Sequence, residues 1–244
     1  MKSPNKNKRS QVRRRPRFSR PFVSATFAMT VDGKITTKNL SPVDFTSRED
    51  KMHLFRQRAL ADAVLIGHTT LERDNMRLGL PLELQQQRIK RGKTAAPLRV
   101  IVSDRGKIDD RLKIFQSDVS PVIIFSSNQM PKTNQQALAG KATLHIERSK
   151  HVDLRKMLRT LRTKYHARKV ACEGGATLFH SLLEVGLVDQ LNLTIAPYLF
   201  GGALAPTLTG LTGEFLPASI HCRLVGMSVV GNECFLTYRI RKQR

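Results

Sequence analysis

Tryptophan is absent from the sequence, cysteine is scarce, and no long apolar run occurs. The three cysteines, Cys172, Cys222 and Cys234, lie far apart without CxxC spacing, so neither a disulfide framework nor a zinc site is predicted. The seven histidines show no HExxH pattern or other paired ligand spacing, and no metal is expected. No stretch reaches the roughly 18 apolar residues of a transmembrane helix. These scarcities predict a cytoplasmic protein with reduced thiols and no membrane span.

Acidic residues are also scarce relative to basic ones. The chain holds 42 Lys and Arg against 19 Asp and Glu, a net charge of +23. Nine of the basic residues lie within residues 1–20, which contain no acid, so the rest carries 33 basic residues against 19 acids, or +14. This surplus favours anionic ligands, and for an enzyme of small molecules it indicates phosphorylated ones.

Residues 1–19 are polar and basic and lack apolar periodicity, which predicts a disordered tail. The tail has no apolar core of the kind found in secretory signals, and it is too poor in serine and amphipathic pattern to resemble a transit peptide. Such a basic arm is expected to bind RNA weakly and without specificity. The folded domain is predicted to span residues 20–244.

The most informative stretch is 170–178, Val-Ala-Cys-Glu-Gly-Gly-Ala-Thr-Leu. It predicts a buried strand that ends at Glu173, a turn of small residues, and a helix that starts on exposed backbone N–H groups. Such a helix start binds anions, because free donors and the helix dipole act together. A purely structural role for the Gly-Gly turn stays open, since neither GxGxxG nor GxxxxGK[ST] is present.

Apolar strand patterns alternate with helical ones along most of the chain. A capping box at 46–49 predicts that Thr46 caps a helix and that Glu49 reaches back to it. Residues 81–96 are polar and are expected to form a surface excursion. Strands are predicted at 22–29, 63–67, 98–102, 121–125, 142–146, 170–172 and 191–197, with a hairpin of 224–230 and 233–240. This order predicts one three-layer α/β domain, with a mostly parallel central sheet and an antiparallel C-terminal hairpin.

Four blocks, in order, resemble the reductase domain of riboflavin biosynthesis, which has a dihydrofolate-reductase-like fold. They are Arg20-Pro21-Phe22-Val23 with 28–34 (Ala-Met-Thr-Val-Asp-Gly-Lys); Arg58-Ala59 with 63–70 (Ala-Val-Leu-Ile-Gly-His-Thr-Thr); 173–178 (Glu-Gly-Gly-Ala-Thr-Leu); and 186–190 (Gly-Leu-Val-Asp-Gln) with Ala196-Pro197 and Gly201-Gly202. The resemblance implies an NADPH-dependent reductase that converts a ribosylaminopyrimidine 5′-phosphate to its ribitylamino form.

The resemblance also implies roles for residues. Glu173 and Asp74 are the implied catalytic residues, and the implied substrate contacts are Arg58 to the phosphate, Glu173 to the ribose or pyrimidine, and Leu78. The implied cofactor contacts are Met29, Thr70, Asp74, Ser103, Gly174, Gly175, Ala176, Thr177 and Leu178. Arg105 joins them because it is the nearest guanidinium to Ser103 that could pair with the 2′-phosphate of NADPH, with Lys107 behind it. Asp104 counts against a preference for NADPH at this turn, because its carboxylate could repel that phosphate or bind an NADH ribose.

Several positions depart from the family pattern and keep alternatives open. The deaminase motifs H-x-E and P-C-x-x-C are missing, so no deamination is expected. Asn75-Met76, Pro81 and Thr26 replace residues common on the substrate side, which leaves the diamino-pyrimidinone, the amino-uracil or another substrate possible. A nucleic-acid-binding protein on a non-catalytic version of the fold is the alternative of another class. A true dihydrofolate reductase is disfavoured because the chain lacks tryptophan.

Two spatial predictions complete the interpretation. Because all the site residues follow strand ends, Glu173 and Gly174–Thr177 should line the main cleft, facing Thr70 and Asp74 at the carboxyl edge of the sheet. The C-terminal strands carry apolar residues on both faces (Leu224, Val225, Met227, Val229 and Val230), which together with the family's habit of pairing predicts a homodimer through this sheet edge.

Overall fold

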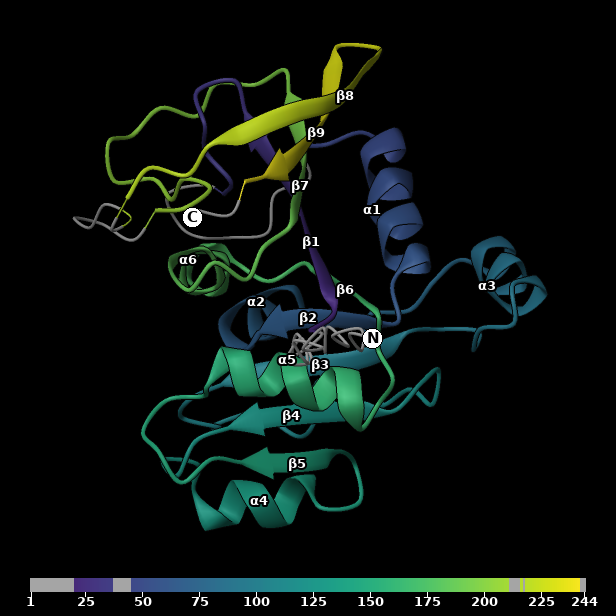
Figure 1. Ribbon diagram of the computed structural model, residues 1–244, viewed down its shortest axis with the longest axis vertical. Helices are drawn as coiled ribbons and strands as arrows, with labels where there is room; N and C mark the ends of the chain where they lie inside the picture. The colour runs from purple at the N-terminus through teal and green to yellow at the C-terminus, as the bar shows by residue number, and fades with distance from the viewer. Residues whose placement is uncertain (1–19, 37–44, 211–215, 217, 242–244) are drawn as a thin grey trace, which may run out of the picture.

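The computed structural model describes residues 20–36, 45–210, 216 and 218–241, and the predicted tail, 1–19, lies outside these ranges. A nine-stranded sheet forms the centre of the molecule, in the order β5-β4-β3-β2-β6-β1-β7-β9-β8 (Figure 1). The strands are β1 (Phe22–Thr30), β2 (Ala63–Gly67), β3 (Leu98–Ser103), β4 (Val122–Ser126), β5 (Thr143–Ile146), β6 (Lys169–Cys172), β7 (Gln190–Ala196), β8 (Cys222–Val230) and β9 (Glu233–Ile240).

The strands from β5 to β7 are parallel, and β9 and β8 close the sheet antiparallel, as predicted. Strands β2 and β4 read as nearly continuous apolar runs because helices cover both of their faces. The order of the elements gives the three-layer architecture expected of the dihydrofolate-reductase-like fold. The helices are α1 (Arg48–Leu60), α2 (His68–Asp74), α3 (Leu82–Lys90), α4 (Lys132–Leu138), α5 (Leu154–Thr163) and α6 (Ala176–Glu184).

Alternate residues of each strand face different helices. Ala63 and Leu65 of β2 pack with α5 and α6, whereas Val64 and Ile66 pack with α2 and α4. Met157, Leu158 and Leu161 of α5 are fully buried in this core. Helix α1 packs against β1 and β6, and a smaller cluster joins it to α3. Within the described parts of the chain, no helix is long and apolar enough to cross a bilayer.

One local prediction was wrong, and another, the surface excursion at 81–96, missed a helix. Ser47, not Thr46, caps α1: its side-chain oxygen accepts from the Asp50 N–H at 3.1 Å. The reason is tertiary, because the backbone N–H of Ser47 donates to Glu233 of β9, which fixes Ser47 at the helix start. The polar segment 81–96 contains α3, whose Arg88 is buried and donates to the carbonyls of Ala59, Ala61 and Thr94.

Candidate active site

The turn from β6 to α6 packs tightly on the turn from β2 to α2. A Cβ on Gly174 would lie 2.4 Å from the backbone nitrogen of Gly67, and one on Gly175 would lie 2.6 Å from the Thr70 hydroxyl. The Gly175 N–H donates to that hydroxyl at 2.8 Å. Close packing therefore explains why both positions are glycine: without side chains, the turns that follow the adjacent strands β2 and β6 can come into contact.

The same turn leaves the start of α6 open. Gly175 is the N-cap residue, and no side chain caps the helix. Among the described residues, the N–H groups of Ala176, Thr177 and Leu178 have no acceptor. The predicted open helix start is therefore present, and three free donors at the positive end of a helix dipole suit an anion.

Glu173 and Arg58 meet at this edge although 115 positions separate them. The Arg58 Nε donates to Glu173 Oε1 at 2.9 Å, and its Nη2 donates to Oε2 at 2.6 Å. Both side chains are buried, with exposed fractions of 5% and 4%. Arg58 also donates to the carbonyl of Gly79 and lies over the Phe55 ring. The strand end, the end of α1 and the loop after α2 are thereby locked together.

Helix α2 supplies the other two predicted residues of this edge. Thr70 contacts Gly175, so the prediction that Thr70 lies at the edge of the Gly-Gly turn is confirmed. Asp74 is the last residue of α2, next to Asn75 in the left-handed conformation, and its side chain is only partly covered by the protein. Partial burial raises the pKa of the Asp74 carboxyl, and nearby Arg73 opposes this rise.

Met29 and Leu78 lie apart from the turn. Met29 is half-buried near the end of β1, where it packs against the cluster that contains α6. Leu78 has φ +54°, and its side chain is 1% exposed, packed in the cluster on the other face of the sheet. In this position the Leu78 side chain packs inside the protein under the loop that follows α2. Only the backbone of Leu78 could therefore contact a substrate.

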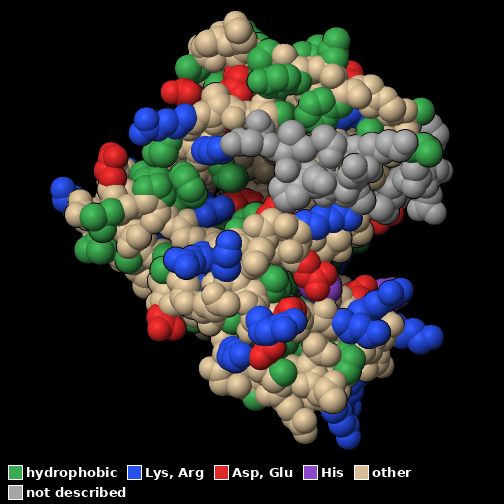
Figure 2. All heavy atoms as spheres, turned by 180° about the vertical axis from the view of Figure 1, so that it is seen from behind, with side chains coloured by type: hydrophobic (Ala, Val, Ile, Leu, Met, Phe, Trp, Pro, Cys, Tyr) green, Lys and Arg blue, Asp and Glu red, His purple; other side chains and the backbone are tan. Residues whose placement is uncertain are grey.

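Ser103 and Arg105 follow β3, further along the sheet. The Ser103 hydroxyl is buried and accepts from the Gly106 N–H at 3.0 Å, and Arg105 is exposed. The Asp104 carboxylate accepts from the Val152 N–H and pairs with His151, each at 2.8 Å. The loop before α5 thus fixes the orientation of the Asp104 carboxylate, which keeps its negative charge beside Arg105. Lysine and arginine side chains are spread over the lower half of the molecule, which holds β3, β4 and β5 (Figures 1 and 2).

A cavity of about 370 Å³ lies elsewhere, at the C-terminal end of α6, and its lining includes Arg155, Val185 and Ile240. None of the predicted site residues lines it. The site is therefore assigned from the side chains and N–H groups that converge at the carboxyl edge, not from a cavity. In the described ranges, no group of three or more His, Cys, Asp and Glu could hold a metal ion.

The described geometry agrees with one protein family. The family model described as the RibD C-terminal domain matches residues 21–236. The chain belongs to this family. A relative from Archaeoglobus fulgidus, named 2,5-diamino-6-ribosylamino-4(3H)-pyrimidinone 5′-phosphate reductase, is 30% identical over 91% of this chain and 100% of its own length. The riboflavin biosynthesis protein RibD of Actinobacillus pleuropneumoniae is 28% identical over 90% of this chain, but the match covers 57% of that protein.

Solved structures of other proteins share the fold. A pyrimidine reductase-like protein from Corynebacterium diphtheriae gives a TM-score of 0.82 at 20% identity, covering 91% of this chain and 93% of that one. The riboflavin biosynthesis reductase Rib7 of yeast (Saccharomyces) gives 0.67 at 21% identity, covering 91% and 90%. Sequence reasoning found the blocks that place the chain in this family but missed the Arg58–Glu173 ion pair. The sequence did contain a signal for this ion pair, because a carboxylate at the end of a buried strand requires a partner.

Proposed function

We propose that this chain is an NADPH-dependent reductase of riboflavin biosynthesis, which converts a ribosylaminopyrimidine 5′-phosphate to its ribitylamino form. Two relatives that this chain matches over 100% and 99% of their own length are named as a pyrimidinone phosphate reductase. The observation that carries the proposal is the carboxyl edge of the sheet, where an open helix start lies beside a paired, buried carboxylate. The first element suits an anionic cofactor, and the second suits a polar substrate.

Bound NADPH would supply the hydride for this reduction. The N–H groups of Ala176, Thr177 and Leu178 would hold its pyrophosphate, and Gly174 and Gly175 would allow the close approach. The Thr70 hydroxyl accepts from Gly175, so its own proton is free to be donated to the same anion. Met29, Ser103 and Asp74 remain proposed contacts of the cofactor.

Arg58 and Glu173 act as a unit in this proposal. Glu173 is fixed in orientation by the two hydrogen bonds from Arg58, and it offers its remaining lone pairs to hydroxyl or amine donors of the substrate. Arg58 keeps one free N–H on each terminal nitrogen, because each of these nitrogens makes one described hydrogen bond. A substrate phosphate at Arg58 would use those hydrogens.

The experiment is NADPH oxidation by the purified protein with each of the two candidate substrates, the diamino-pyrimidinone and the amino-uracil ribosyl phosphates. Oxidation with one of them supports the proposal and identifies the pyrimidine. Oxidation with neither compound would reject it and leave a reductase of another substrate. The nucleic-acid alternative predicts RNA binding that survives about 150 mM salt without NADPH binding, whereas phosphate contacts of a basic arm alone weaken steeply with salt.

Preference for NADPH over NADH is proposed to depend on Arg105. Its side chain is exposed after β3, and Asp104 beside it is held by His151 and Val152. A charge-assisted hydrogen bond contributes about 1.5–3 kcal/mol. Arg105→Ala should therefore lower the NADPH to NADH ratio of kcat/KM by roughly tenfold to a hundredfold. An unchanged ratio would show that Arg105 is a surface residue without this role.

A homodimer through β8 is also proposed. This edge strand is exposed along its whole length, and Met227, Val229 and Leu224 are 68%, 61% and 47% exposed. An edge with open N–H and C=O groups and apolar side chains on both faces is suited to a second copy, which would add a strand and cover those side chains.

A further inference from the structure

Basic side chains gather at the amino edge of the sheet, at the opposite ends of the strands from the candidate active site. The parallel strands begin together there: Lys169, the first residue of β6, pairs with Phe22, the first residue of β1. Ala63, the first residue of β2, pairs with Leu98, the first residue of β3. We define the amino-edge surface as Arg20, Lys90, Arg91, Lys93, Arg168 and Lys169.

Asp62 holds two parts of this surface together. Its carboxylate accepts from Lys93 Nζ at 2.7 Å, and it accepts from the backbone N–H groups of Arg168 and Lys169 at 2.8 and 2.9 Å. These donors come from the segment before β3 and from the start of β6. Basic residues that lie far apart in the sequence are therefore neighbours in space at this edge.

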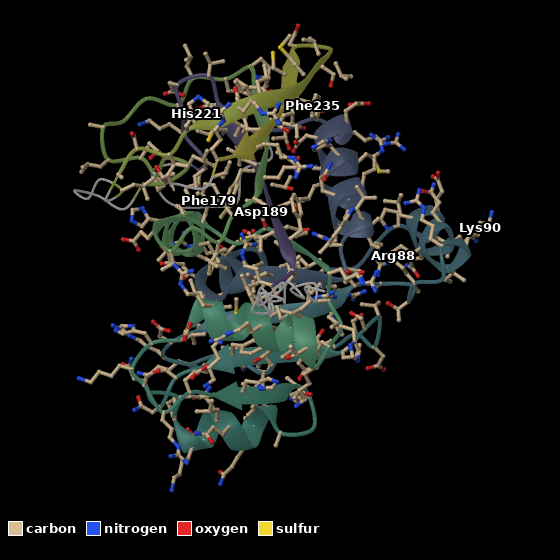
Figure 3. All side chains as sticks on the ribbon, viewed as in Figure 1. Arg88, Lys90, Phe179, Asp189, His221 and Phe235 are labelled. Atoms are coloured by element: carbon tan, nitrogen blue, oxygen red, sulfur yellow. The ribbon has the colours of Figure 1, made fainter. Side chains whose placement is uncertain are left out.

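A buried arginine fixes the end of α3 at the same place. Arg88 donates to the carbonyls of Ala59 and Ala61, directly before β2, at 2.8 and 2.5 Å. Lys90 and Arg91 follow at the end of the same helix and are exposed. Figure 3 shows Lys90 at the outer side of α3, whereas Arg88 lies on the side of the sheet. The helix thus adds two cations to the surface around Asp62.

The acids at this edge are occupied, and most of the cations are not. Asp62 has the three donors named above, and Asp189, before β7, accepts from Arg20 at 2.6 and 2.8 Å. Glu83 and Asp118, further along the edge, form no ion pair with a described residue. Four exposed side chains make no ion pair among the described residues: Lys90, Arg91, Arg168 and Lys169. The edge therefore carries a net positive charge that the protein itself does not neutralise.

The basic N-terminal sequence joins the chain at this same edge. Arg20 directly precedes β1, and the Phe22 N–H donates to the carbonyl of Arg168 at 2.8 Å. Residues 1–19 contain eight further Lys and Arg and no acid. The charge of the amino-edge surface is thus continued by the sequence attached to it. This second observation sets the amino edge apart from other basic patches of the molecule.

We propose that the amino-edge surface and residues 1–19 together bind the phosphate backbone of RNA, without base specificity. Five of the eight basic residues in 1–19 are arginine, whose guanidinium group pairs with phosphate through two hydrogen bonds. Contacts to phosphates fix position but read no bases. The surface lies at the opposite end of β6 from Glu173, so RNA bound there leaves the carboxyl edge open for the reductase.

RNA suits this surface better than a lipid bilayer. A peripheral segment that lies in a membrane buries an apolar face among the lipids. Residues 1–19 contain three apolar side chains, Met1, Val12 and Phe18, which are too few and too widely spaced for such a face. Charge alone is left to drive binding, and a chain of phosphates provides the matching charge along its length.

The experiment measures how a fluorescently labelled single-stranded RNA binds the full chain at salt concentrations from about 50 to 200 mM. The surface variant combines Lys90→Ala, Arg168→Ala and Lys169→Ala. Each lost phosphate contact lowers the slope of log K against log salt by about 0.7, so the three substitutions should lower it by about 2. At the lowest salt concentration the Kd should rise at least about tenfold.

A matched control removes the same charge elsewhere. It combines Lys132→Ala, Arg148→Ala and Lys150→Ala, three exposed positions that follow β4 and β5, and it should bind RNA like the wild type. Both variants should keep the thermal unfolding midpoint and any reductase kcat of the wild type, because all six side chains are exposed. If the substitutions in β6 impair folding, Lys90→Ala with Arg91→Ala, confined to the end of α3, repeats the test.

A third variant tests the N-terminal sequence. Arg13→Ala, Arg14→Ala and Arg15→Ala together should also lower the salt slope, because both parts bind one RNA. A surface variant with the wild-type slope overturns the inference and assigns RNA binding to residues 1–19 alone. An equal loss in the control overturns it as well, since net charge would then be responsible. Binding to phosphatidylserine vesicles without binding to RNA would reject RNA as the partner.

Discussion

The buried ion pair of Arg58 and Glu173 dominates the site at the scale of single residues. Two charges removed from water gain little net stability together, but loss of one partner leaves the other buried and unpaired. Arg58→Met should therefore destabilise the fold by about 3–5 kcal/mol, measured by urea unfolding at neutral pH. Arg56→Met, an exposed position on the same helix, is the control and should cost under about 0.5 kcal/mol.

Substitution of both partners separates stability from binding. Arg58→Met combined with Glu173→Gln should recover part of the lost stability, because the buried charge is gone. The double variant should still bind the pyrimidine phosphate poorly if both groups contact it. Equal unfolding free energies for Arg58→Met and Arg56→Met would contradict the assignment of a buried, functional pair.

Asp62 gives the molecule a predicted pH dependence. Burial alone would raise the pKa of this carboxyl, but hydrogen bonds from Lys93 Nζ and from the N–H groups of Lys169 and Arg168 outweigh burial and lower it. A lowered pKa in the folded state means that the stabilisation is complete above the unfolded value, about 3.9, and is lost as the pH falls through the folded value.

Asp62→Asn should accordingly cost about 1.5–3 kcal/mol of unfolding free energy at pH 7, the range for hydrogen bonds to a charged group. The difference from the wild type should shrink at about pH 3, where protonation of Asp62 begins to remove the same stabilisation. Denaturant unfolding at the two pH values tests this expectation. A difference that stays constant between them would mean that the charge of Asp62 is irrelevant.

At the scale of elements, the contact of two turns decides where α6 begins. Gly174→Ala would drive a Cβ to 2.4 Å from the Gly67 nitrogen, which is backbone and cannot move aside. The variant should lose at least about 1–3 kcal/mol of stability, the usual cost of overpacking, and should weaken NADPH binding because the helix start shifts. Thermal unfolding and cofactor titration measure the two effects.

Gly79→Ala is the control for this substitution. A Cβ at Gly79 meets open space, and its φ lies outside the left-handed region. The Gly79→Ala variant should change stability by a few tenths of a kcal/mol and is measured in the same titration. A Gly174→Ala protein with wild-type stability and cofactor affinity would contradict the close packing of the two turns.

At the scale of the whole molecule, the exposed edge strand predicts association. Met227→Glu would place an unpaired charge in the proposed β8 interface, a cost of several kcal/mol, and should weaken dimerisation more than about a hundredfold. Sedimentation at micromolar concentration should show a dimer for the wild type and a monomer for the variant. Leu82→Glu, on α3 and exposed to the same 68%, should remain dimeric. A monomeric wild type would contradict the prediction.

Two buried arginines make contacts that could not be predicted from the local sequence pattern. Arg88 and Arg99 are each 2% exposed, and both donate to backbone carbonyls rather than to carboxylates. Burial lowers the pKa of both guanidinium groups. Arg88 lies in a polar segment, where a basic residue is expected at the surface, whereas Arg99 interrupts the apolar strand β3. Their partners lie 15 or more residues away, apart from the Thr94 carbonyl that Arg88 also holds, so no local spacing reports them.

The sequence by itself determined the alternation of strands and helices, the parallel core, the C-terminal hairpin and the Gly-Gly turn, because these depend on side-chain periodicity and backbone freedom within a few residues. Only the tertiary structure decided that Arg58 meets Glu173 and that Glu233 fixes the cap of α1 across 186 positions. Those contacts depend on strand order and on which face each residue presents. Neither the strand order nor the face that a residue presents is encoded locally. Burial of apolar area is non-directional, so it does not specify which polar groups will be enclosed together.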